Sequence, residues 1–509
     1  MRLHEVAPPR SLATAPRGQS PAPSFRLPDL SLFGALFVAA ALRLVALGSA
    51  PLAPAEAATW AAASEGIPAL ASGSSLSVFA AAGFAAVAGL SELSLRWLSA
   101  AAGVVVVALC APVARRLGGP ALARWAVWLA ATSPYLIFYD RTATPLALTT
   151  LLAMLAIWFY LFLPTGRARY VVGFTGAMLL LSWTSWAFAV VALAQGAFLW
   201  VRRPSRRAWR LWLGGAALAA LGAVLWWRAP AFVLAPDQSS DLAAEAAALA
   251  YKLIAPMAAF ALGETLAAGQ PVGLAGLVLV SWLAVVGLRR LSKSGRQFVL
   301  IFWLLPVLWT AAVTALVLPR AEAPSISAVV GYAWPPFGLT LAAGMVALSA
   351  SVRRLAYTGL VAIAAFSLGS YFHARTIAQP DFFLPLDPAL RFIEARAEEG
   401  DVILAEPETM MARHAARLTA PLAVIDCADE AAREALFAER PPPRLWHVDA
   451  PTGGGRPWQA RLDAWLAAQY WAVETRRYAE PDPVMAALKT RLLGLSPEAG
   501  LVLTLYQRR

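Results

Sequence analysis

The fold is decided by the stretch SLRWLSAAAGVVVVALCAPVARRLGGPALARWAVWLAATSPYLIFYD (residues 94–140). It contains two apolar runs, 94–114 and 122–139. Each run is long enough to cross about 30 Å of hydrocarbon as a helix that rises about 1.5 Å per residue. Two arginines separate the runs, and Asp140 follows the second run. Long apolar runs with short basic connections are typical of membrane-spanning helices.

Apolar runs of this kind recur along most of the 509 residues, of which 59% are hydrophobic and only 14% are charged. That composition leaves too little polar surface to cover a soluble protein of this size. The run 170–201 is about twice the length of one span, and we predict that it breaks at SWTSW (182–186). The chain is therefore predicted to be a polytopic α-helical membrane protein with about eleven transmembrane helices. Apart from the two halves of 170–201, the predicted spans lie near 30–47, 94–114, 122–139, 144–163, 209–227, 272–288, 298–317, 329–349 and 355–371.

Arg and Lys residues cluster in alternate connections between the spans. Short cytoplasmic loops carry the excess of positive charge in membrane proteins, so these connections and the N-terminus are predicted to be cytoplasmic. The net charge of +12 then reflects topology and not nucleic-acid binding, because the clusters form no continuous basic face. An odd number of spans places the C-terminus outside, and we predict a multi-pass protein of the plasma (inner) membrane. The basic connections contain Arg115, Arg116, Arg124, Arg167, Arg169, Arg202, Arg203, Arg206, Arg207, Arg210, Arg289, Arg290, Lys293, Arg296, Arg353 and Arg354.

Segments outside the spans also have predicted roles. Residues 1–28 are rich in Pro, Ser and Arg, and we predict that they form a disordered cytoplasmic leader before the transmembrane domain, 29–375. Counting 74–90 as a further span would reverse the side of every later basic connection. We therefore predict that 54–66 and 74–90 are helices on the outer surface, and that another surface helix lies near 240–262.

Residues 376–509 differ from the rest of the chain, because their composition is more polar and their apolar runs have the length of strands. Strands that alternate with helices are typical of α/β layer domains. We predict a small extracytoplasmic α/β domain with a largely parallel sheet. The predicted strands are VILAE (402–406), LAVID (422–426), RLWHV (444–448) and LVLTLY (501–506), and helical patterns lie at 387–399, 407–418, 428–438 and 457–470.

Ionisable residues at the outer ends of the spans are the candidates for chemistry, because charges at membrane depth are costly. Glu56 follows the first span, and Asp140 with Arg141 lies between the third and fourth spans. Either carboxylate is a candidate catalytic base that takes a proton from an acceptor. In the alternative, structural interpretation, Glu56 caps a surface helix, and Asp140 pairs with Arg141 or caps the helix that begins near Thr142.

Two tryptophans flank the predicted break in the run 170–201. Trp183 and Trp186 are candidates for an aromatic platform under a sugar or an isoprenoid, or they are interfacial anchors. The four histidines lie in different parts of the chain and show no metal-ligand spacing, so we predict neither a metal site nor a cofactor.

Several long segments resemble a known family in their order and flanking pattern. They include LRLVALGSAPLAPAEAATW (42–60), ARWAVWLAATSPYLIFYDRTATPLAL (123–148), LLLSWTSWAFAVVAL (179–193), YAWPPFGLTLAAG (332–344) and PALRFIEARAEEGDVIL (388–404). Their order resembles the C-fold (GT-C) membrane glycosyltransferases, in particular the protein O-mannosyltransferase branch that also contains the lipid A aminoarabinose transferase. The resemblance covers nearly the whole chain.

The resemblance implies transfer of a sugar from a polyprenyl-phosphate donor to an acceptor at the outer face of the membrane, within the bacterial cell envelope. In such an enzyme Glu56 or Asp140 would hold the acceptor proton, and Arg141 would offset the phosphate charge of the donor. Four family features are altered here. The first-loop Asp-Glu pair falls on Ala55-Glu56, and the Arg-Glu-Ala-Arg run falls on Arg141-Thr142-Ala143-Thr144. A His-Pro-Pro segment is missing at 73–76, and an Arg-Tyr pair is replaced by Ala328-Val329.

These observations leave two hypotheses open, because a fold does not fix a function. In the first, the chain is a divergent transferase in which Glu56 or Asp140 serves as the base. In the second, it is a pseudoenzyme, either a scaffold subunit of a membrane complex or a protein that binds a lipid-linked glycan. Both hypotheses predict membrane lipid as a partner, and both predict that Glu56 and Asp140 approach each other across a cavity beneath the first outer loop.

Overall fold

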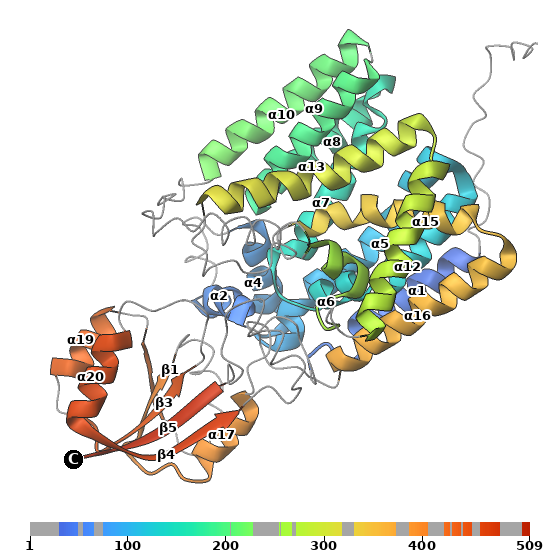
Figure 1. Ribbon diagram of the computed structural model, residues 1–509. Coiled ribbons are helices and arrows are strands. Elements are labelled where there is room, and N and C mark those ends of the chain that lie inside the picture. Colours follow the sequence, from blue (N-terminus) through green and yellow to red (C-terminus); the bar gives the residue numbers. More distant parts are fainter. Residues whose placement is uncertain are drawn as a thin grey trace, which may run out of the picture.

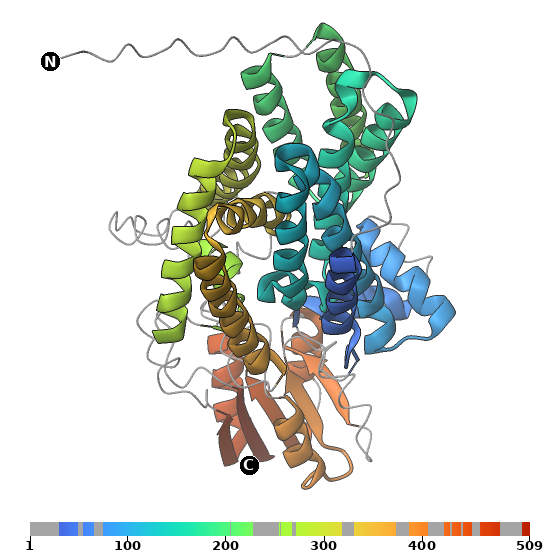
Figure 2. The same ribbon diagram turned by 90° about the vertical axis from the view of Figure 1, so that its right-hand side faces the viewer.

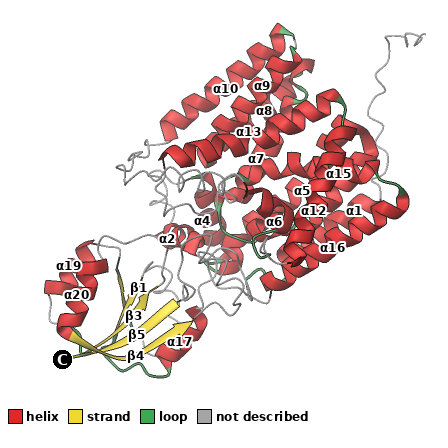
Figure 3. Ribbon diagram, viewed as in Figure 1, coloured by secondary structure: helices red, strands yellow, loops and turns green. Residues whose placement is uncertain are grey.

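The computed structural model describes residues 30–48, 54–65, 75–203, 205–226, 254, 256–266, 271–317, 330–372, 386–405, 422–427, 430–438, 441–449, 459–478 and 501–509. A large helical domain is followed by a smaller domain with a five-stranded sheet (Figure 1). Strands occur only near the C-terminal end of the described chain, and helices make up the rest (Figure 3). In two perpendicular views the sheet lies at one end of the helices (Figure 2).

Each predicted span corresponds to a helix, or to one arm of a bent helix, in the described chain. Among the described residues, six helices are long and apolar enough to cross a membrane by length and composition. The predicted polytopic helical architecture is therefore confirmed. The helices are α1 (Leu30–Leu44), α5 (Glu92–Thr132), α7 (Pro145–Tyr160), α8 (Ala168–Thr184), α9 (Ala187–Arg202), α10 (Arg206–Trp226), α12 (Pro271–Arg290), α13 (Lys293–Val317), α15 (Trp334–Ala347) and α16 (Ala350–Phe372).

Helix α5 contains two of the predicted spans, which Gly119 divides into two arms. The backbone of Gly119 has a φ of 86°, a conformation that glycine adopts without steric cost. Pro120 begins the second arm, where its missing N–H group breaks no helical hydrogen bond. The predicted break in the run 170–201 is also present, because α8 ends at Thr184 and Ser185 is extended.

Short helices connect or cover the spans. Two predicted surface segments are helical, as α2 (Pro54–Glu65) and α4 (Leu76–Ala88). Of the third, predicted near 240–262, only the helical turn at 256–262 is continuously described, and residues 240–253 lie outside the described residues. Helix α6 (Pro134–Asp140) leads from α5 to α7. Two 3-10 turns, η1 (Leu163–Thr165) and η3 (Gly331–Ala333), follow α7 and precede α15.

Helices α12 and α15 cross in close backbone contact. A Cβ atom added at Gly287 of α12 would collide with the backbone carbonyl of Thr340, and one added at Gly344 of α15 would collide with the carbonyl of Leu283. Small residues permit backbone contact of this kind between membrane helices. The two helices therefore pack main chain against main chain.

The sheet of the C-terminal domain has the strand order β2-β1-β3-β5-β4. Strands β2, β1 and β3 are parallel, whereas β5 pairs antiparallel with both β3 and β4. The prediction of a largely parallel sheet is therefore corrected, since two of its four pairings are antiparallel. The strands are β1 (Val402–Ala405), β2 (Ala423–Asp426), β3 (Arg444–Asp449), β4 (Tyr470–Tyr478) and β5 (Leu501–Arg508).

Helices cover both faces of this sheet. Alternation along the strands turns Ile403 and Trp446 toward α17 (Leu386–Glu394) and turns Leu404 and Leu445 toward the opposite face. The opposite face is covered by α19 (Glu430–Ala438) and α20 (Gln459–Gln469). The sequence predicts an α/β layer domain, and the structure shows that it has three layers. The helix predicted at 407–418 lies outside the described residues.

Candidate functional site

Glu56 lies in the first turn of α2, where an acidic residue is favoured by the helix dipole. Its side chain is fully buried. Oε1 accepts hydrogen bonds from Arg96 Nε at 2.8 Å and from Ala143 N at 2.7 Å, and Oε2 accepts from Arg96 Nη2 at 2.5 Å. Arg96 belongs to the first arm of α5 and also donates from Nη1 to the carbonyl of Leu47 at 3.1 Å. Glu56 thus joins α2, α5 and the turn after α6.

Asp140 is the last residue of α6, and its side chain is buried. Its Oδ2 accepts a hydrogen bond from Arg43 Nε at 2.7 Å. A Cβ atom added at Gly103 would collide with this carboxylate, which therefore lies directly against the backbone of α5. Because a negative charge at a helix C-terminus opposes the helix dipole, Asp140 depends on the neighbouring guanidinium. The structural alternative that pairs Asp140 with Arg141 is corrected, because the partner is Arg43.

Arg43 and Arg141 both bond to backbone carbonyls in addition to these contacts. Arg43 Nη1 donates to Ala39 O and Ala131 O, and Nη2 donates to Ala130 O, at 3.2–3.3 Å. Arg141 closes the C-terminus of α1 through four carbonyls at 2.7–3.2 Å, those of Leu42, Arg43, Val45 and Ala46. A cation in this position satisfies the last carbonyls of a helix and complements its dipole.

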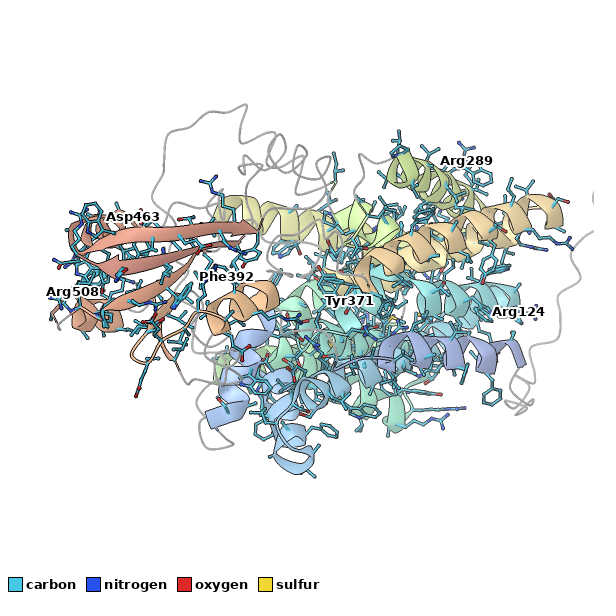
Figure 4. All side chains as sticks on the ribbon, turned by 90° about the horizontal axis from the view of Figure 1, so that it is seen from below. Arg124, Arg289, Tyr371, Phe392, Asp463 and Arg508 are labelled. Carbon is cyan, nitrogen blue, oxygen red and sulfur yellow. The ribbon has the colours of Figure 1, made fainter. Side chains whose placement is uncertain are left out.

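The Arg141 side chain also contacts the end of α16. Its Nε donates to Tyr371 Oη at 3.3 Å, and its guanidinium lies over the rings of Tyr371 and Phe372. We call the six residues Arg43, Glu56, Arg96, Asp140, Arg141 and Tyr371 the α1-end network. Seen from below, Tyr371 lies between the sheet domain and the distant Arg124 and Arg289 (Figure 4). The network is therefore on the side of the helical domain that faces the sheet.

The two tryptophans singled out in the sequence lie at the α8–α9 turn. The Trp183 ring contacts Phe79 of α4, with 5.8 Å between ring centroids. Trp186 is half-buried and packs against the core of the helical domain. The structure thus brings Glu56, Asp140 and Arg141 together around the end of α1, and it places Trp183 and Trp186 on the flank of α4 and the core.

Sequence reasoning missed the partners of the two acids. Arg43 and Arg96 each interrupt an apolar run, and an ionisable residue in such a run is rarely without a partner. That rule would have singled them out. A second missed contact is the hydrogen bond from Tyr139 Oη to Glu264 Oε1 at 2.7 Å, which links α6 to the segment before α12. Among the described residues, no cluster of three or more His, Cys, Asp or Glu could hold a metal ion.

The contacts of the α1-end network join α1, α2, α5 and α6, and its charged side chains are buried. The turn from Asp140 to Ala143 links the two acids, because it begins at one carboxylate and its last N–H group donates to the other. The predicted cavity beneath the first outer loop would border residues 49–53 and 66–74, which lie outside the described residues. Its presence stays a prediction.

Comparisons with known proteins identify the fold. No family model matches the sequence, and no curated protein matches it significantly. The crystal structure of ArnT from Cupriavidus metallidurans in the apo state is similar, with a TM-score of 0.53, 14% identity, and coverage of 94% of this chain and 97% of ArnT. Weaker likenesses are the archaeal oligosaccharyltransferase AglB from Archaeoglobus fulgidus (TM-score 0.49, 11% identity, 82% and 69% coverage) and the mycobacterial arabinofuranosyltransferase AftD (TM-score 0.48, 14% identity, 94% and 39% coverage). The chain therefore has the GT-C fold of membrane glycosyltransferases, as its resemblance to that family implied.

Proposed function

We propose that this chain binds a polyprenyl-phosphate-linked sugar at the outer face of a bacterial inner membrane without transferring it. The observation that carries the proposal is the environment of Glu56. This carboxylate is fully buried and accepts three hydrogen bonds, two of them from a guanidinium. A general base must instead reach the proton that it removes, directly or through one water.

Glu56 is a poor base in this setting for two reasons. The Arg96 guanidinium donates charge-assisted hydrogen bonds to both carboxylate oxygens, which occupies the atoms that a base would use. An acceptor hydroxyl would also have to displace Arg96 or the Ala143 N–H group from the carboxylate oxygens. The neighbouring Ala55 stands where the family resemblance leads us to expect the acidic base. Glu56 therefore acts as a structural tie.

The lipid ligand is proposed from the fold. ArnT from Cupriavidus metallidurans has been crystallised bound to undecaprenyl phosphate. A chain with the same fold over nearly its whole length offers helices of the same arrangement to such a carrier. A pseudoenzyme that retains this ligand would serve as a lipid-linked glycan-binding protein or as a scaffold subunit of a membrane complex.

A second candidate function, a divergent transferase, is favoured by the state of Asp140. Its Oδ2 is held by Arg43, but its Oδ1 accepts no hydrogen bond from any described residue. The side chain is 4% exposed. One carboxylate oxygen is therefore available to accept a proton if an acceptor reaches it. In this candidate Asp140 is the base, and Glu56 keeps its structural role.

The two functions are separated by measuring binding and transfer on the same material. Purified protein in lipid nanodiscs would be offered a radiolabelled polyprenyl-phosphate sugar, and bound donor and released sugar would be measured together. We expect saturable binding with no transfer. Transfer by the wild-type protein, abolished in Asp140→Asn with donor binding retained, would establish the second candidate. Absence of donor binding by folded protein would overturn both.

A further inference from the structure

A second cluster of charged and aromatic residues lies far from the α1-end network, where α7 ends and α8 begins. Arg96 of that network and Arg116 both belong to the first arm of α5. Twenty residues separate them in the sequence, which corresponds to about 30 Å along a helix. That length is about the thickness of the hydrocarbon core of a bilayer. Arg116 therefore lies near the membrane surface opposite the α1-end network.

The cluster is built on two stacked aromatic rings. Phe162 follows α7 and Tyr170 lies in the first turn of α8, with ring centroids 4.8 Å apart and an interplanar angle of 17°. The guanidinium of Arg116 lies 5.2 Å from the centroid of Phe162, and that of Arg169 lies 4.8 Å from the centroid of Tyr170. Arg169 Nη2 also donates to Tyr170 Oη at 3.0 Å.

A third arginine reaches the same segment from α10. Arg207 Nη2 donates to the carbonyl of Gly166 at 3.2 Å. A Cβ atom added at Gly166, whose φ is 64°, would collide with this guanidinium. Glycine thus admits Arg207 to the turn between the two aromatic residues. We call Arg116, Phe162, Arg169, Tyr170 and Arg207 the arginine–aromatic cluster.

The charges of this cluster are not neutralised within the described chain. Between Leu93 and Pro236 the sequence contains thirteen arginines and one acid, Asp140. Asp140 is occupied by Arg43 at the other end of the helices. No described carboxylate pairs with Arg116, Arg169 or Arg207, and all three side chains are exposed. An anion from outside the chain would therefore meet no competing carboxylate here.

The backbone of α8 adds to this preference. Helix α8 has 17 residues and begins at Ala168, within the cluster, and no side chain in the described structure caps its N-terminus. The first N–H groups of a helix lack intrahelical partners and, with the helix dipole, favour a phosphate. The arginines and the helix N-terminus thus present donors to one small region.

We propose that the arginine–aromatic cluster binds the phosphodiester headgroup of an anionic phospholipid from the adjoining leaflet. Guanidinium groups bind phosphate oxygens through paired hydrogen bonds. Basic pockets between transmembrane helices recognise anionic headgroups in this way. The stacked rings suit the same depth, because aromatic side chains favour the membrane–water interface. The acyl chains of the lipid would then lie along the apolar surfaces of the neighbouring helices.

The test uses full-length protein in nanodiscs of phosphatidylcholine with or without phosphatidylglycerol, with lipid retention measured by native mass spectrometry. The variant Arg116→Gln/Arg169→Gln/Arg207→Gln is compared with Arg289→Gln/Arg290→Gln/Arg354→Gln, which removes three exposed arginines elsewhere. We expect phosphatidylglycerol to bind about 100-fold more weakly to the first variant, because three guanidinium groups that would hold the headgroup phosphate are lost. The control variant should keep the wild-type affinity.

Three results would overturn the proposal. Equal losses in the two triple variants would show a diffuse electrostatic attraction with no site. The second concerns thermal unfolding of the detergent-solubilised protein. If inorganic phosphate raises the unfolding temperature as much as phosphatidylglycerol does, the cluster is a site for free anions. If the triple variant does not fold, Arg169→Gln replaces it, because that exposed side chain lies over the ring of its neighbour Tyr170 and donates to its hydroxyl. An unchanged phosphatidylglycerol affinity in Arg169→Gln would then refute the proposal.

Discussion

The variant Glu56→Gln tests directly whether this carboxylate is a structural tie. The substitution keeps the shape of the side chain but leaves the Arg96 guanidinium, 3% exposed, without its negative partner. It also turns one of the two oxygens that accept from Arg96 into a nitrogen donor. Removing one partner of a buried ion pair typically destabilises a protein by about 3–5 kcal/mol. We expect a loss of this size in the free energy of unfolding.

A double-mutant cycle distinguishes this loss from a general effect of substitution. In Glu56→Met/Arg96→Met neither charge of this pair is left buried, and the remaining penalty includes the unpaired Ala143 N–H group and Leu47 carbonyl. We expect the double variant to lose about 2 kcal/mol or less, well below the sum of the two single losses. The exposed Glu394→Gln serves as the control and should change stability by less than about 0.5 kcal/mol.

The assay is reversible unfolding of the full-length protein in mixed detergent micelles, followed by tryptophan fluorescence. A Glu56→Gln variant as stable as the wild type would refute the assignment of a structural role to Glu56. If the loss of stability in the double variant equals the sum of the losses in the two single variants, Glu56 and Arg96 have no pairing energy. A Glu56→Gln variant that is stable but has lost a measured transferase activity would instead identify Glu56 as a catalytic base.

Three further predictions concern other parts of the chain. Gly103→Ala should destabilise the helical domain by about 1–3 kcal/mol in the same unfolding assay, because its methyl group would collide with the Asp140 carboxylate, and an unchanged stability would contradict that contact. Burial raises the pKa of Asp401 above its usual value, although the hydrogen bond from Trp446 lowers it, so protonation stabilises the folded form. The stabilisation from protonated Asp401 is complete below the pKa of the unfolded state, about 4, and is lost as pH rises through the pKa of the folded state. The variant Asp401→Asn should remove that part of the pH dependence of thermal unfolding. A reporter active only outside the cytoplasm and fused after Arg509 should be active, and an inactive fusion would change the span count by one.

Hydrophobic length made the helical domain predictable, but it did not reveal the contacts between helices. The Ser182–Trp186 break could be recognised because polar residues interrupt a run too long for one span. By contrast, Arg43 pairs with an acid 97 residues away and Arg96 with one 40 residues away. No local period records a pairing over such separations, so only the tertiary packing of α1, α2 and α6 against α5 reveals it.

Strand β4 shows a different limit of sequence patterns. Its sequence YWAVETRRY carries three charges, and its side chains are mostly exposed because it forms an edge of the sheet. The register also shifts between Ala472 and Glu474, which interrupts regular alternation. An edge strand of this kind lacks the alternating apolar pattern from which strands are recognised. Strand β4 was therefore missed, whereas β1, β2, β3 and β5 were predicted from their apolar runs.

The main-chain contact between α12 and α15 limits how the helical domain can move. Helices separated by long side chains can slide past each other when those side chains change rotamer. At Gly287 and Gly344 no side chain intervenes, and each glycine lies against a carbonyl of the other helix. The two helices are therefore expected to move as one rigid body, so that a ligand that shifts Pro335 and Pro336 on α15 would carry α12 with it. Rearrangement of the bundle would have to occur at the borders of this pair.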